Sequence, residues 1–96
     1  MQDEFFEWDD TKAATNWRDN SITFEMARDA FKDAFSIDWI DNRQDTPEER
    51  LNTLAVVGDR LLHVSYTLRG DRIRILSARK AEPHERRRYH NENRET

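Results

Sequence analysis

The chain has 96 residues, of which 35% are hydrophobic, 38% charged and 10% aromatic, and its formal net charge is −4 at pH 7. This length predicts a single domain over residues 1–96 with a small core, and the aromatic content argues against disorder. The absence of cysteine excludes a disulfide framework, a thiolate nucleophile and a thiol metal site. Without a long apolar run or a signal-like segment, we expect a soluble, cytoplasmic protein that makes no contact with a membrane.

The first third of the chain predicts a short strand followed by two helices. The aromatic run over residues 4–8 favours a strand, and Asp9 or Asp10 is suited to cap the next helix. We expect that helix to end at Asn20, because asparagine tolerates the left-handed conformation of a helix terminus. The second helix is expected to begin after Thr23. Its apolar residues recur at helical spacing: Phe24, Ala27, Ala30, Phe31, Ala34 and Phe35.

The remainder of the chain predicts four strands and a terminal helix. Residues 36–41 alternate as a strand would, and residues 46–49, Thr-Pro-Glu-Glu, have the pattern of a capping box that opens one helical turn. Three further strand-like runs cover residues 51–57, 61–68 and 72–78. The turn residues between these runs favour an antiparallel meander. Residues 82–96 are predicted to form a polar C-terminal helix or tail.

Together these elements predict an α+β fold, in which an antiparallel sheet carries the two N-terminal helices on one face and a helix follows at the C-terminus. In the run from residue 72 to 80, Arg72 and Arg74 alternate with Ile73 and Ile75, so the arginines should share the uncovered face. Guanidinium groups are planar forks suited to phosphate oxygens. Our hypothesis is that this strand forms the floor of an RNA site.

The distribution of charge is consistent with that hypothesis. Residues 1–59 carry 6 Lys and Arg against 15 Asp and Glu, whereas residues 60–96 carry 10 against 5. Such asymmetry predicts a polarised surface, with a basic half that meets phosphates and an acidic half that meets a basic partner. Two ordinary solvated faces would give the same counts, so charge alone leaves both interpretations open.

Short motifs run through nearly the whole chain in a fixed order: Phe6-Glu7-Trp8-Asp9, Lys12 and Asn16, Phe24-Glu25 with Ala27 and Phe31, Glu49-Arg50, Gly58, and Tyr66-Thr67-x-Arg69. The most specific segment is residues 74–81, Arg-Ile-Leu-Ser-Ala-Arg-Lys-Ala, followed by Glu85-Arg86 and Tyr89. In this order and spacing the chain resembles the BrnT toxins, which are ribonucleases of toxin–antitoxin pairs.

The resemblance implies a fold similar to that of RelE-type toxins and a metal-independent endoribonuclease activity that inhibits translation and needs no cofactor. It also implies a cognate BrnA-like antitoxin, a ribbon-helix-helix DNA-binding protein that neutralises the toxin. Operator DNA would then be reached only through the antitoxin.

The chain departs from the family at one position that bears on chemistry. Where the family usually has Lys-His-Gly, this chain has Arg18-Asp19-Asn20. Asn20 can replace glycine in a left-handed cap, but Asp19 cannot donate a proton near neutral pH as histidine does. Two functions therefore stay open: an active ribonuclease, and a catalytically silent module that binds the antitoxin and acts as a co-repressor. A plain structural adaptor would require the motif match to be accidental.

Metal-free RNA cleavage needs groups that transfer protons and positive charge on the developing phosphorane. The candidate catalytic residues are Lys12, Arg69, Arg74 and Arg79 as cations, with His63 and Tyr66 for acid–base work. The candidates that extend an RNA track are Lys80, Arg86 and Arg87, although a basic helix also suits antitoxin docking. Surface ion pairs, a solvated histidine and a core tyrosine are the ordinary alternatives. No metal site is expected, since the histidines lack ligand spacing.

Overall fold

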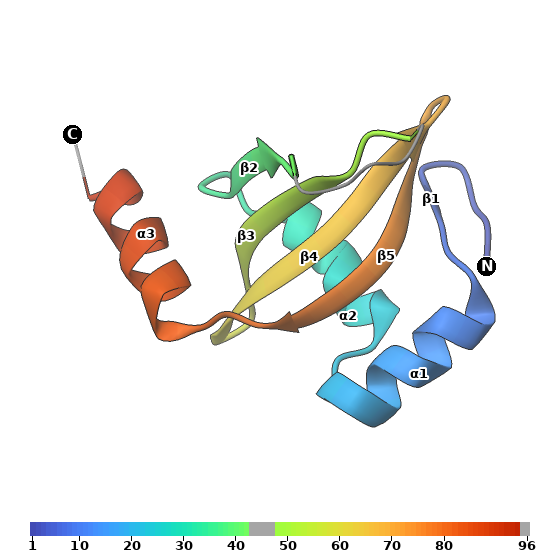
Figure 1. Ribbon diagram of the computed structural model, residues 1–96, viewed down its shortest axis with the longest axis horizontal. Coiled ribbons are helices and arrows are strands. Elements are labelled where there is room, and N and C mark those ends of the chain that lie inside the picture. The colour runs from blue at the N-terminus through green and yellow to red at the C-terminus, as the bar shows by residue number, and fades with distance from the viewer. Residues whose placement is uncertain (43–47, 95–96) are drawn as a thin grey trace.

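The computed structural model describes residues 1–42 and 48–94. Its elements follow the chain in this order: β1 (Phe6–Glu7), α1 (Asp10–Asn20), α2 (Phe24–Arg28), the 3₁₀ helix η1 (Asp29–Lys32), β2 (Ile37–Ile40), β3 (Leu51–Val57), β4 (Arg60–Arg69), β5 (Arg72–Lys80) and α3 (Pro83–Asn93). Figure 1 shows the sheet between the N-terminal helices and α3. The predicted α+β class is confirmed.

The strands form one sheet in the order β1-β5-β4-β3-β2. Strands β2 to β5 pair antiparallel, as predicted for a meander, and β1 lies parallel to β5 at the outer edge. Gly58 and Gly70 occupy the two tight turns with φ of 64° and 59°. Glycine adopts this left-handed conformation without a Cβ clash, which explains its place in both turns.

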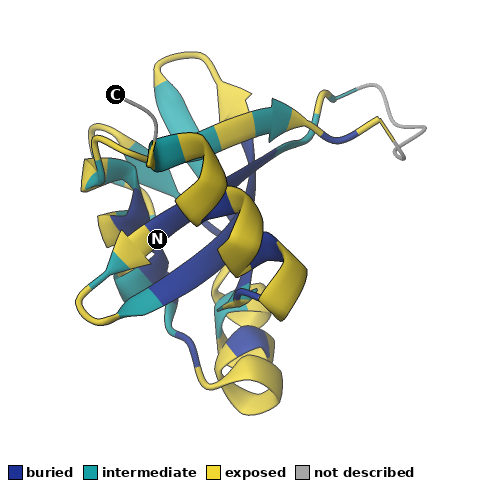
Figure 2. Cartoon of the chain, turned by 90° about the vertical axis from the view of Figure 1, so that its left-hand side faces the viewer, coloured by how far each residue is buried: buried dark blue, intermediate teal, exposed yellow. Residues whose placement is uncertain are grey.

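One face of the sheet is covered by the segment from α2 through η1. The buried apolar residues of this core are Trp8, Ile22, Phe24, Ala27, Ala30, Ala55, Leu62, Val64, Ile75 and Ala78. Figure 2 shows buried residues along the strands, whereas the helices turn exposed residues outward. Apolar alternation in the strands therefore meets the apolar side of the helical segment, as the pattern predicted.

Helix α1 meets the sheet at the edge of β5, beyond the point where β1 stops pairing. Asn16, the buried residue of α1, donates from Nδ2 to the Ala78 carbonyl at 2.9 Å and to the Ile22 carbonyl at 2.8 Å. Its Oδ1 accepts from the Ala78 amide at 3.0 Å. The side-chain amide of Asn16 thus takes the place of a neighbouring strand and satisfies backbone groups that would otherwise be unpaired.

Two predicted helix ends are corrected by the structure. Ser21, not Asn20, holds the left-handed position after α1 with φ of 59°, because the Asn20 side chain instead donates to the Ala78 carbonyl at 3.1 Å. The second helix does not extend through Phe35, which is 63% exposed. Asp33 ends it by accepting from the amides of Phe35 and Val56 at 2.9 and 2.8 Å.

The capping box predicted at residues 46–49 falls partly outside the described residues, which exclude Thr46 and Pro47. Residues 48–50, just before β3, are not helical.

The C-terminal segment forms an ordered helix that packs on the sheet. Helix α3 begins with Pro83 and a capping box made by Glu82 and Glu85, and Tyr89 joins a second apolar cluster with Leu54 and Leu61. The sheet face opposite α2 is therefore covered at one end and is not wholly free, contrary to expectation. In the described part of the chain, no helix has both the length and the apolar character required to cross a membrane.

Replacement of Asn16 by alanine should lower the free energy of unfolding by about 2–4 kcal/mol, because the Ala78 amide and the Ile22 carbonyl lose the partner that Asn16 gives them. Urea denaturation followed by circular dichroism measures this loss. Asn20→Ala is the matched control, since Asn20 makes one partly buried bond to the same carbonyl and should cost about 0.5–1.5 kcal/mol. Equal losses for the two variants would contradict the edge role of Asn16.

Candidate functional site

The register between β4 and β5 decides which polar side chains share the face opposite α2. His63 pairs with Arg79, and Thr67 pairs with Arg74. Side chains of directly paired residues leave the sheet on the same face, and residues two apart along a strand do the same. His63, Thr67, Arg69, Arg74 and Arg79 therefore project from one face.

A β-bulge in β5 is required for this arrangement. Ser65 pairs with Ser77, whereas the next residue, Tyr66, pairs with Ile75, which leaves Leu76 as the extra residue. In a regular strand, residues 74 and 79 would point to opposite faces because their separation is odd. The bulge reverses the alternation and so places both arginines on the same face.

The larger hollow on this face lies at the end away from α3. It has a volume of about 510 Å³ and is lined by Lys12, Glu48, Arg50, Thr67, Arg69, Arg74 and Leu76. We refer to it as the basic hollow, because four of its seven lining residues are cations. Three of these residues, Lys12, Arg69 and Arg74, are candidates from the sequence, and the fold brings them together from α1, β4 and β5.

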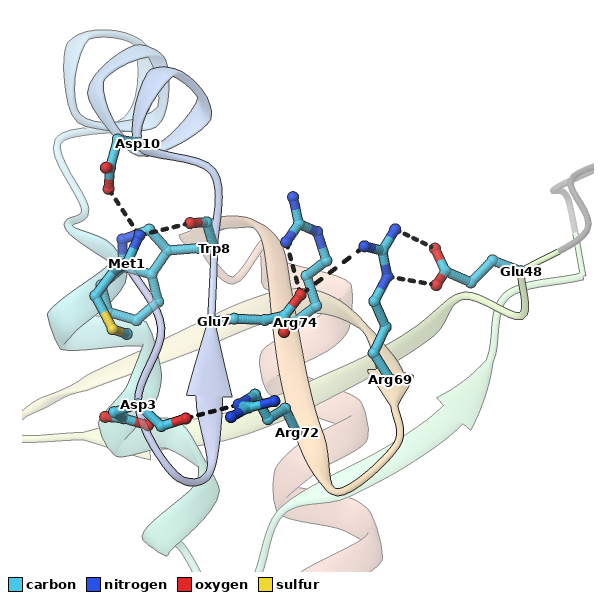
Figure 3. Close-up of polar contacts among 9 residues, drawn as sticks. All are labelled: Met1, Asp3, Glu7, Trp8, Asp10, Glu48, Arg69, Arg72 and Arg74. Carbon is cyan, nitrogen blue, oxygen red and sulfur yellow. Dashed lines mark hydrogen bonds and ion pairs between the residues drawn. The ribbon is translucent and has the colours of Figure 1, made fainter.

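Arg69 and Arg74 of the basic hollow are already paired with carboxylates, which corrects the expectation of an open cationic face. Arg74 donates to Glu7 at 2.7 Å, and Arg69 donates to both oxygens of Glu48 at 2.7 and 3.3 Å. Figure 3 shows Glu7 reaching from β1 towards both arginines. The hydrogen bond from Arg69 lowers the pKa of the Glu48 carboxyl, and the same bond raises the pKa of Arg69.

Arg72 follows the same alternation as Arg74, but it does not line the basic hollow. Its Nε donates to the backbone carbonyl of Asp3 at 2.7 Å, as Figure 3 shows. Arg72 therefore holds the N-terminal segment against β5.

Thr67 is a residue of the basic hollow that sequence reasoning missed. It is only 3% exposed, and its Oγ1 has no hydrogen-bond partner among the residues that the structure describes. An unpaired buried hydroxyl costs about 1–3 kcal/mol. Its place in the motif Tyr66-Thr67-x-Arg69 is its mark in the sequence, but threonine is otherwise an ordinary strand residue and was not singled out as a candidate.

A second hollow lies under α3 and contains the candidates His63 and Arg79. It has a volume of about 410 Å³ and is lined by Trp39, Ile40, Asp41, Asn42, Asn52, His63, Arg79, Glu82, His84 and Glu85. We refer to it as the histidine hollow. His63 is 8% exposed, and its ring meets that of Trp39 edge to face at 5.6 Å.

Glu85 organises the charges of the histidine hollow. Arg79 donates to its two oxygens at 2.9 and 3.0 Å, and His63 Nε2 lies 3.9 Å from its Oε2. Burial alone would raise the pKa of the Glu85 carboxyl, but the bonds from Arg79 and from the Glu82 amide outweigh it and lower the pKa to about 2. Glu85 is thus an anion at neutral pH, suited to orient His63 as a proton donor or acceptor.

The same helix start contains the one group of metal-ligand types found in the described residues. Glu82, His84 and Glu85 bring ligand-type atoms within 4.8 Å of one another. Both oxygens of Glu85 are engaged by Arg79, and the other two residues are exposed. This donor set fits an ion pair at a helix start better than a metal centre.

Four other candidates lie away from the two hollows. Tyr66 packs edge to face on Phe31 at 5.0 Å on the helix-covered side. Burial is the main cause that raises the pKa of the Tyr66 hydroxyl, and its hydrogen bond to Asp38 raises the pKa further. Tyr66 is therefore a poor proton donor near neutral pH. Lys80 pairs with the core residue Leu62 and so also points to that side.

Arg86 and Arg87 are exposed on α3, and neither lines the basic hollow. The structure instead places Arg88, which was not a candidate, over the ring of Trp39 at 4.4 Å. Trp39 is half-buried.

Asp19 lies close to Lys12, next to the basic hollow. The two residues line a smaller hollow of about 220 Å³ together with Thr11, Thr15, Asn16, Asn20, Leu76 and Ser77. Arg18 donates to the Asp19 carboxylate at 3.1 Å. Asp19 therefore adds a negative charge to a hollow that the candidate cation Lys12 also lines.

Comparison with protein families identifies the class of this small α+β domain as a toxin of a type II toxin–antitoxin system. The matching model is described as ribonuclease toxin, BrnT, of type II toxin-antitoxin system, and it covers residues 8–85. The chain therefore belongs to the BrnT family, and the resemblance seen in the sequence is confirmed. No curated protein matches the chain. Arg86 and Arg87 lie beyond the matched segment.

The depressed pKa of Glu85 predicts a loss of stability in acid. Since the pKa of about 2 in the folded state lies below the ordinary value of 4.5 for glutamate, the stabilisation is complete above about pH 4.5 and is lost as the pH falls towards 2. In urea titrations, the difference in unfolding free energy between the wild type and Glu85→Gln should shrink over that range. Glu4→Gln, on an exposed residue, should show no such pH-dependent difference.

Proposed function

We propose that this chain is a metal-independent endoribonuclease toxin that cleaves RNA on the sheet face shared by the two hollows. The observation that carries the proposal is the gathering of Lys12, Arg69 and Arg74 around one concave site on that face, in a chain of the BrnT ribonuclease family. Preorganised cations stabilise the charge that develops on a phosphorane without a bound metal.

The two hollows offer different chemistry to an RNA strand. The basic hollow supplies positive charge for the phosphate, and the histidine hollow supplies an imidazole held beside Trp39 and Glu85. His63 and Thr67 are four residues apart on β4, which separates their Cα atoms by about 13 Å. An RNA strand laid along β4 would thus meet both hollows, with His63 as the proposed proton-transfer residue or as a contact to a flanking nucleotide.

The proposal includes a BrnA-like antitoxin with a ribbon-helix-helix DNA-binding part as the partner that silences the toxin, and operator DNA is contacted only through that partner. The type II family supports an antitoxin in general terms. Trp17, Phe35 and Leu68 are more than half exposed and are the proposed apolar contacts, since large exposed apolar residues mark binding surfaces.

Removal of the Arg69 guanidinium should slow RNA cleavage by about 10²–10³-fold, the usual effect of losing one charge-stabilising donor. The measurement is single-turnover cleavage of bulk RNA by the wild type and Arg69→Ala in the presence of EDTA. Lys32→Ala is the matched control, because Lys32 is an exposed cation of η1 paired with Asp29 and should retain the wild-type rate. Both variants are checked for folding by circular dichroism.

Two outcomes would contradict this proposal. Folded wild-type protein that cleaves no RNA with or without EDTA would refute the ribonuclease activity, and cleavage that EDTA abolishes would refute metal independence. An unchanged rate for Arg69→Ala would remove the basic hollow from the reaction.

A second function is favoured by the carboxylates at the site. Asp19 replaces the usual histidine of the family. In the basic hollow, Glu48 forms an ion pair with Arg69, and Glu7 forms one with Arg74. A catalytically silent module, which binds the antitoxin and acts as its co-repressor, would tolerate such neutralised cations. It would bind the antitoxin as well as an active toxin does, but it would not cleave RNA.

Asp19→His separates the two functions. If the silent module is correct, this substitution should produce RNA cleavage that the wild type lacks, since an imidazole beside Lys12 supplies the missing proton-transfer group, worth about 10²–10⁴-fold. Asp19→Asn is the matched control, because it removes the negative charge without adding an imidazole. Equal gains in both variants would assign the effect to charge, and a wild type that already cleaves RNA would reject the silent module.

A further inference from the structure

The basic hollow combines two features that arise independently. Its rim has cations from three elements, Lys12 on α1, Arg69 on β4 and Arg74 on β5. Its lining also includes Thr67, which is only 3% exposed and whose hydroxyl has no partner in the described part of the chain. Buried polar groups in folded proteins are nearly always hydrogen-bonded, and each exception requires an explanation such as a ligand.

The position of Thr67 relates its hydroxyl to the cations. Thr67 is the direct cross-strand partner of Arg74, and Arg69 lies two residues further along the same strand on the same face. Thr67 lines the basic hollow together with Arg69 and Arg74, so an incoming ligand would meet it from that side of the sheet. A hydroxyl next to two guanidinium groups would donate to a ligand that is both a hydrogen-bond acceptor and an anion.

The carboxylate of Glu48 indicates the shape of that anion. It receives two hydrogen bonds from Arg69, at 2.7 and 3.3 Å, in the fork geometry that arginine also offers to two oxygens of a phosphate. The pair is exposed on both sides, with side-chain exposures of 49% for Arg69 and 40% for Glu48. An exposed ion pair of this kind contributes little stability, so another anion can replace the carboxylate.

We propose that the basic hollow is a phosphate-binding subsite in which the Thr67 hydroxyl donates to a phosphate oxygen and Arg69 exchanges Glu48 for the phosphate. The ligand class is a phosphodiester of RNA or a free phosphate that presents the same oxygens. The RNA substrate rests on the proposed function, whereas the anion site itself does not. Thr67 is therefore a contact to the substrate that positions the phosphate between the cations.

The first test measures thermal melting in inorganic phosphate against sodium chloride of equal ionic strength. Phosphate should raise the melting temperature of the wild type and of Thr67→Ser, which retains the hydroxyl. Thr67→Val replaces the hydroxyl by a methyl group of similar size, and it should weaken phosphate binding by about ten- to a hundredfold. In chloride, Thr67→Val should melt at or above the wild-type temperature, because no buried hydroxyl is left unpaired.

The matched control is Thr53→Val. Thr53 is equally buried in the sheet, but its hydroxyl donates to Asp38 at 2.6 Å. This variant should lose stability in chloride and keep the full response to phosphate. A phosphate response that is the same in Thr67→Val and the wild type would overturn the subsite, since the hydroxyl would then meet only water. Loss of the phosphate response in Thr53→Val would also overturn the subsite, because that variant keeps the Thr67 hydroxyl.

A second variant tests the exchange at Arg69. Glu48→Gln removes the competing negative charge and should strengthen phosphate binding, whereas unchanged binding would overturn the exchange. The RNA arm uses an oligoribonucleotide with 2′-O-methyl riboses for binding and unmodified RNA for cleavage. If the wild type cleaves RNA and Thr67→Val binds and cleaves equally well, the subsite fails and the ribonuclease stands. If phosphate binding depends on Thr67 but no variant cleaves RNA, the subsite stands and the proposed activity fails.

Discussion

The extra residue of β5, Leu76, is the constraint on which the functional face depends. Without this bulge the strand would keep its alternation, and Arg79 would point into the apolar core beside Leu62 and Val64. With it, β5 buries Ile75 and Ala78 on the helix-covered side while its arginines share the other. The edge of the strand beyond the bulge is then held by α1, whose Asn16 binds both backbone groups of Ala78. Fold and site are therefore linked through one irregular strand.

Because of its carboxylates, this face does not behave electrostatically as a simple basic patch. A cluster of arginines on one small sheet would repel itself, and each pair with Glu7, Glu48 or Glu85 reduces that repulsion. The acidic half and the basic half of the sequence thus meet at the site instead of forming separate poles. In the proposed function, an RNA phosphate would have to compete with the protein's own anions, so its binding would depend on which ion pairs the fold can release.

Local patterns in the sequence were sufficient for the strands and the meander, because alternation and turn glycines act over a few residues, but they overestimated the length of the second helix. The site required contacts that span the chain: Glu7 reaches Arg74 across 67 residues and Glu48 reaches Arg69 across 21. No periodicity reveals such pairs. The bulge did leave a signal, since the adjacent apolar residues Ile75 and Leu76 shift the phase of the alternation. Thr67 stands in one of the quoted motifs, but that motif does not reveal its unpaired hydroxyl, which is a property of its surroundings.

The ion pairs on this face differ in whether the arginine can exchange its carboxylate for another anion. The Arg69–Glu48 pair is exposed, and such pairs contribute about 0–1 kcal/mol. In the pair of Arg79 and Glu85, the Glu85 side chain is only 10% exposed, so breaking this pair would leave a largely buried carboxylate without its cation and would cost more than breaking the exposed pair. Arg79 thus holds α3 on the sheet, and in the proposed function it would act on an RNA strand only through His63 and Glu85. The exchangeable cation Arg69, and with it the proposed phosphate site, lies at the opposite end of β4.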